Sequence, residues 1–128
     1  MSQTASPGFS AYRESVNLDI APLVADLRST LGAKLVAYLG DVKETRAVRQ
    51  WADGERRMPA ETEKRLRLVY HVAGIVLESN KPSVVQSWFQ GLNPHLEDRS
   101  PARLIREMDP DQIGAEILAS ARAFARLG

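Results

Sequence analysis

The chain has 128 residues, with 17 Lys and Arg, 16 Asp and Glu, and no cysteine. This length suits one domain, or two small domains that share a core. The absence of cysteine excludes disulfides and thiolate metal sites, and no apolar run approaches the roughly 20 residues that cross a bilayer. Because the N-terminus also lacks the basic-then-apolar plan of a signal peptide, we expect a cytoplasmic protein that does not contact a membrane.

The first 17 residues have no apolar period and are rich in Ser, Thr, Gln, Pro and Gly, so we expect a disordered tail over residues 1–17. Its single arginine, Arg13, is little charge for an arm that enters a minor groove. From Asp19 the pattern becomes helical, with Asp19 as N-cap and Gly32 as C-cap. One face of this helix carries Ile20, Leu23, Val24, Leu27 and Leu31.

Residues 35–59 have the pattern of two short helices joined by a turn. The first helix has one apolar face, made by Leu35, Val36 and Leu39. We expect Gly40 to end it in the left-handed conformation that a helix C-cap favours. Asp41 and Glu44 have the spacing of a capping box, so a second helix is predicted from about Val42 or Lys43 to about Asp53, closed by Gly54.

The second helix has an apolar side and a polar side. The apolar side carries Ala47, Val48 and Trp51. Arginine can contact guanine through two hydrogen bonds and glutamine can do so with adenine, while lysine and threonine can hold phosphate at a helix start. The candidate DNA-binding residues are Lys43, Thr45, Arg46, Arg49 and Gln50, followed by Arg56 and Arg57. A solvated polar face without a partner is the alternative.

The apolar skeleton of this region favours the DNA-binding interpretation. Val48, Trp51, Gly54 and Pro59 resemble the run that closes the recognition helix in the Xre-like (Cro/cI-type) helix-turn-helix family. Between Lys43 and Arg67 there are eight basic and five acidic residues, although the net charge of the chain is only +1. We therefore expect a homodimer, in which the second copy supplies further phosphate contacts on double-stranded operator DNA.

Pro59 and Glu61 open a long predicted helix that ends before Ser79. Its apolar residues form two stripes, which predicts packing on two sides. We expect this helix to separate the DNA-binding half from the C-terminal half, with Gly74 allowing a close helix approach. His71 is expected to be a packing or hydrogen-bonding residue because no ligand lies at metal-binding spacing.

The C-terminal third has three predicted helices, which begin at Pro82, after Ser100 and after Asp109. We call residues 81–128 the C-terminal module and residues 18–80 the helix-turn-helix domain with its long connecting helix. The predicted fold class is all-α: an Xre-like helix-turn-helix bundle packed through a long central helix on a small helical module.

A second resemblance lies in this module. Its first part consists of Trp88-Phe89, Leu92-Asn93-Pro94 and Leu96, followed by Ser100-Pro101 and Leu104-Ile105. This run resembles the toxin-binding domain of the Xre/MbcA/ParS antitoxin family. The resemblance implies the antitoxin of a type II toxin-antitoxin system. Such a protein neutralises a partner toxin, commonly a RES-domain enzyme that consumes NAD, and represses its own promoter.

The candidate partner-binding residues are chosen from the polar and loop positions of the module, because arginine is favoured at interface hot spots. They are Trp88, Asn93, His95, Arg99, Arg103, Arg106, Arg122 and Arg126. For Trp88 and its neighbour Phe89 the alternative is a place in the core, where aromatic residues at helical spacing usually lie.

The alternatives to an antitoxin are a stand-alone repressor and an enzyme. A stand-alone repressor, whose C-terminal module only dimerises, explains the helix-turn-helix equally well. An enzyme is disfavoured because the sequence has no Ser/His/Asp constellation, no metal-ligand spacing and no glycine-rich phosphate loop. We therefore assign no catalytic residue, metal or cofactor.

Overall fold

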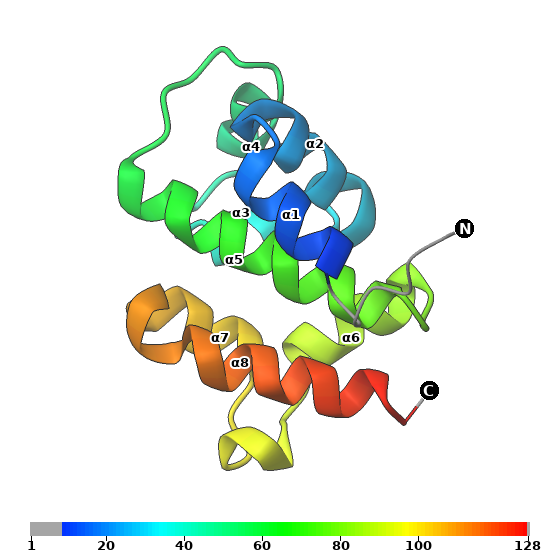
Figure 1. Cartoon of the computed structure of the whole chain (residues 1–128). Coiled ribbons are helices and arrows are strands. Elements are labelled where there is room, and N and C mark those ends of the chain that lie inside the picture. Colours follow the sequence, from blue (N-terminus) through cyan, green and yellow to red (C-terminus); the bar gives the residue numbers. More distant parts are fainter. Residues whose placement is uncertain (1–8, 128) are drawn as a thin grey trace, which may run out of the picture.

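The computed structural model describes residues 9–127, which form helices joined by loops and confirm the predicted all-α fold (Figure 1). The elements are α1 (Phe9–Asn17), α2 (Ile20–Leu31), α3 (Ala33–Leu39), α4 (Thr45–Ala52), α5 (Ala60–Leu77), α6 (Pro82–Gln90), the 3-10 helix η1 (Pro94–Leu96), α7 (Pro101–Glu107) and α8 (Pro110–Ala125). Within residues 9–127, no helix has both the length and the apolar character needed to cross a membrane.

The long helix α5 is the centre of the fold. It packs against α1, α2 and α3 on one side and against α6, α7 and α8 on the other. Figure 1 shows α8 running below α5, with α1 and α2 above it. Buried side chains from both halves, from Leu23 in α2 to Ala121 in α8, form one hydrophobic cluster. The predicted two-sided packing of this helix is therefore confirmed.

The predicted disordered tail is wrong for Phe9–Asn17, which forms α1 and packs on α5. Its buried residues are small: Ala11 and Ser15. Arg67 of α5 holds the end of α1, because its Nη1 donates to the carbonyl oxygens of Ser15 at 3.0 Å and Leu18 at 2.8 Å. Residues 1–8, the rest of the predicted tail, lie outside the described residues.

The turn between α3 and α4 differs from the prediction in two ways. Gly40 has a φ of −84°, and the left-handed position is taken by Asp41, at 58°. Gly40 is needed for space instead, because a Cβ there would lie 3.1 Å from Cζ3 of Trp51. The predicted capping box does not form either: α4 begins at Thr45, and its N-cap, Glu44, makes no side-chain cap bond.

The helix starts of the C-terminal module are as predicted. The Ser100 hydroxyl accepts the backbone N–H of Arg103 at 3.2 Å, and an Asp109 carboxylate oxygen accepts that of Asp111 at 2.8 Å. Both caps satisfy N–H groups that the first helical turn leaves free. The structure adds η1 to the predicted loop between α6 and α7.

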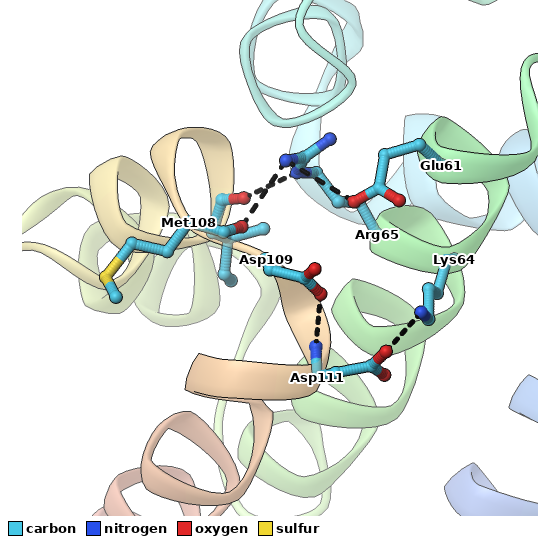
Figure 2. A network of polar contacts seen from close by, with 7 residues as sticks. Glu61, Lys64, Arg65, Met108, Asp109 and Asp111 are labelled. Carbon is cyan, nitrogen blue, oxygen red and sulfur yellow. Dashed lines mark hydrogen bonds and ion pairs between the residues drawn. The ribbon is translucent and has the colours of Figure 1, made fainter.

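A polar network fixes α7 and α8 to α5 (Figure 2). Arg65 of α5 donates from Nε to the carbonyl oxygen of Ile105 at 2.9 Å and from Nη2 to that of Met108 at 3.4 Å. These carbonyls lie at the end of α7, where an arginine is favourable. Lys64 pairs with Asp111 at the start of α8, and this contact raises the pKa of the lysine.

Candidate nucleic-acid interface and partner surface

The predicted orientation of α4 is confirmed. Ala47, Val48 and Trp51 are buried, whereas the opposite side faces solvent. Thr45, Arg46 and Arg49 are exposed, Gln50 is half-buried, and Lys43 is exposed in the turn before the helix. The side chains with groove-reading chemistry therefore share one accessible surface.

Both outward arginines of α4 have acidic neighbours. Arg46 lies 3.5 Å from a carboxylate oxygen of Glu44, and Arg49 lies 3.4 Å from Asp53 and 3.8 Å from Glu55. All five side chains are well exposed, so these ion pairs are weak. They orient the guanidinium groups without preventing exchange of the carboxylates for another anion or for base acceptors.

The loop after α4 carries the two other predicted arginines, both exposed. Arg56 donates from Nη1 to Oε1 of Gln50 at 3.4 Å, and its guanidinium carbon lies 6.0 Å from the centre of the Trp51 ring. Arg57 makes no ion pair with any residue in 9–127. This loop therefore places cations beside α4, as the sequence predicts.

A hollow of about 750 Å³ lies between α3, the start of α4 and α7. Its basic and hydroxyl-bearing lining residues are Lys34, Tyr38, Lys43, Thr45, Arg46 and Arg106. Lys34 was not among the predicted DNA-binding residues, although it lies in the first turn of the short helix α3. Sequence reasoning also missed the contribution of α7, because that depends on tertiary packing.

Arg106 was predicted to face a partner protein, and in the structure its side chain contacts other parts of the same chain. Its Nη1 donates to the carbonyl oxygen of Tyr38 at 3.1 Å, its Nη2 lies 3.1 Å from a carboxylate oxygen of Asp41, and its guanidinium carbon lies 4.5 Å from the centre of the Tyr38 ring. The side chain is thus directed at α3 and the turn. Arg106 therefore joins the C-terminal module to the helix-turn-helix.

Two other predicted partner residues are buried. Trp88 is 8% exposed and packs edge-on against Phe89, with ring centres 5.2 Å apart. Asn93 is also 8% exposed, and its Oδ1 accepts the backbone N–H of His95 at 2.9 Å. The structure therefore favours the core alternative for Trp88, and Asn93 shapes the loop that a partner would meet.

The other predicted partner residues are exposed and fall into two groups. His95, Arg99 and Arg103 lie in or next to the loop between α6 and α7, and Arg122 and Arg126 lie at the end of α8. Sequence reasoning missed Leu92, which is 75% exposed in the same loop. The end of α8 also carries an exposed leucine, Leu127 at 85%, so each group places an apolar side chain beside cationic ones.

Comparison with known proteins adds one structural relative. No family model and no curated protein matches the chain. The structure is similar to a chain in the crystal structure of the M. tuberculosis MbcT-MbcA toxin-antitoxin complex, with 27% sequence identity and a TM-score of 0.63. The match covers 80% of this chain and 94% of the other. This chain is therefore similar, over most of its length, to an antitoxin in a toxin-antitoxin complex.

Proposed function

We propose that this protein is the antitoxin of a type II toxin-antitoxin system, acting in the cytoplasm as a partner-binding protein and not as an enzyme. The observation that carries the proposal is the match to nearly the whole length of a chain in the MbcT-MbcA complex. The resemblance of the C-terminal module to the Xre/MbcA/ParS family supports the same conclusion from the sequence, and favours a RES-domain toxin that consumes NAD.

The toxin-binding surface that we propose is centred on the loop between α6 and α7. Leu92 offers an apolar side chain, and His95, Arg99 and Arg103 follow it in the sequence with hydrogen-bond donors. Arg99 is held by the carbonyl oxygen of Leu96, 2.8 Å from its Nε. A loop shaped by internal hydrogen bonds loses little conformational entropy when a partner binds.

The second activity that we propose is repression of the protein's own promoter by a homodimer. The exposed side of α4 would enter the major groove, with Arg46, Arg49 and Gln50 directed at base edges, while Arg56 and Arg57 contact phosphates. One α4 gives a short half-site with few phosphate contacts, so two copies on a palindromic operator are expected.

Expression of the neighbouring gene with and without this chain tests the proposed antitoxin activity. The neighbour alone is expected to stop growth, and co-expression of this chain is expected to restore it. Leu92→Ser should weaken the rescue without changing the fold, because the leucine is 75% exposed. Val16→Ser is the matched control, since this apolar residue on α1 is also well exposed, at 56%.

A stand-alone repressor is the second candidate. The observation that favours it is that α6, α7 and α8 pack into the same hydrophobic cluster as the helix-turn-helix, without a partner protein. Such a repressor would bind operator DNA and leave the growth effect of any neighbouring gene unchanged.

A further inference from the structure

We propose that Arg106 is a phosphodiester-binding residue, so that α7 of the C-terminal module forms one wall of the DNA-binding surface. This inference rests on the proposed DNA-binding function and extends it beyond α4 and the loop that follows. It assigns to Arg106 a role on DNA in place of the role on a partner protein that the sequence predicted.

The first argument is the charge of the hollow between α3, α4 and α7. Four cationic side chains line it, and Glu44 is the single acidic residue among its lining residues. Lys34 and Lys43 make no ion pair with any described residue. Cations gathered around a concave surface raise its potential and attract an extended anion such as a nucleic-acid backbone.

The second argument is the way in which the guanidinium of Arg106 is held. The Tyr38 ring lies 4.5 Å from its central carbon, and the Tyr38 carbonyl oxygen accepts one N–H at 3.1 Å. These two contacts fix the plane of the group. Its other terminal nitrogen is directed at the Asp41 carboxylate, 3.1 Å away. Arginine can hold a phosphate with the same planar set of donors.

The third argument is that a phosphate can replace the Asp41 carboxylate, which pairs with Arg106 in the structure. The side chain of Asp41 is 60% exposed and that of Arg106 is 30% exposed, so solvent screens their ion pair. A phosphodiester oxygen has the charge and the acceptor geometry of the carboxylate. Arg106 can therefore turn from Asp41 to a phosphate while it stays on Tyr38.

The fourth argument is the position of the hollow beside the start of α4. The same hollow is lined by Thr45 and Arg46, the first two residues of α4. The N-cap, Glu44, makes no side-chain cap bond, so the first turn offers N–H groups to an anion. A DNA strand whose bases meet α4 would thus bring its phosphates along a surface that ends at Arg106.

The test is a salt series of binding measurements on random-sequence duplex DNA, with the full chain and three variants. Arg106→Gln should lower the affinity and flatten the salt slope by about 0.9 for one lost phosphate contact. Arg28→Gln is the matched control, because Arg28 is an exposed arginine on α2 that does not line the hollow. Its slope should equal that of the unmodified protein.

Asp41→Asn is the third variant and keeps the test decisive if Arg106→Gln fails to fold. Asparagine tolerates the φ of 58° at this position, and the change frees Arg106 from its carboxylate. Affinity for any sequence should rise. An unchanged slope in folded Arg106→Gln, equal losses in both arginine variants, or no gain in Asp41→Asn would overturn the proposal.

A separate result would contradict the proposed DNA-binding function itself. If the unmodified protein binds neither random duplex DNA nor the DNA upstream of its own gene, that function is contradicted, and the role of Arg106 with it. If Lys43→Gln and Arg46→Gln weaken binding while Arg106→Gln does not, only the role of Arg106 is overturned.

Discussion

Gly74 of α5 lies so close to α1 that a Cβ built on it would stand 2.4 Å from the Cβ of Ala11. No pair of Cβ atoms is found at such a distance, so one helix would have to move to accept any larger residue. The contact connects the N-terminal helix to the central helix through two of the smallest side chains. The packing of α1 therefore depends on a glycine more than 60 positions along the chain.

Gly74→Ala is expected to destabilise the protein by about 1–3 kcal/mol, because the added methyl group forces α1 away from α5. Gly114→Ala is the matched control: it is also within a helix, but its Cβ would meet Leu68 at an ordinary 3.7 Å. That change should be neutral or stabilise by up to about 1 kcal/mol through helix propensity. Urea unfolding of both variants measures the difference, and equal stabilities would contradict the close approach.

Trp51 is 3% exposed, and its buried Nε1–H has no hydrogen-bond acceptor among the described residues. Trp51→Ala should cost about 3–5 kcal/mol of unfolding free energy by leaving a cavity behind α4. Trp51→Phe should cost much less, because it keeps an aromatic ring and removes the unsatisfied donor. Chemical denaturation measures the free energy of unfolding of both variants. A stable Trp51→Ala variant that has lost DNA binding would show that the indole faces outward.

His71 is half-buried in α5, and its ring lies 5.4 Å from that of Tyr12. Burial lowers its pKa below the ordinary value of 6.5, and the positive charge of Arg122 lowers it further. The folded protein therefore binds a proton less readily than the unfolded chain. The free energy of unfolding should be highest above pH 6.5 and should fall as the pH drops from there through the pKa of the folded state.

Arg122→Gln is expected to raise the pKa of His71 towards its ordinary value and to reduce this loss of stability in acid. Arg126→Gln, at the C-cap of α8, removes the charge of an arginine that does not shift the pKa of His71, and it should leave that pKa unchanged. An NMR titration of the His71 ring measures both. A His71 that titrates at or above pH 6.5 in the unmodified protein would contradict its burial.

On DNA, the arginines of α4 and those of the loop should behave differently. Arg46→Ala or Arg49→Ala should cost about 1–3 kcal/mol at the preferred sequence and relax the preference for a base there. Arg56→Ala or Arg57→Ala should weaken all sequences alike and flatten the salt slope by about 1. Competition between specific and random duplexes distinguishes the two classes. Equal losses from all four changes would refute a reading role for α4.

Local signals explain which parts of the fold could be predicted. The caps at Ser100 and Asp109 form between residues two or three positions apart, so their spacing is visible in the sequence. The apolar period of α2 and the two apolar stripes of α5 are also local patterns. The predicted start of α4 was early by two or three residues, because Asp41 has a left-handed φ of 58° and not the extended conformation of an N-cap.

What could not be predicted depends on contacts between distant residues. The helix α1 buries Ala11 and Ser15 and exposes Phe9, Tyr12 and Val16, so its hydrophobic pattern points away from its packing face. The direction of Arg106 depends on Tyr38, 68 positions earlier. The burial of Asn93 follows from the bridge that it makes with Arg99 across the loop.

The central claim is that this chain binds and neutralises a toxin encoded beside it, and co-purification tests it most directly. The tagged chain would be expressed from its native DNA with the flanking genes intact, and the masses of the purified proteins would be measured. We expect a stoichiometric partner encoded by an adjacent gene. Recovery of this chain alone, still able to shift the DNA upstream of its gene, would contradict the claim and identify a free-standing repressor.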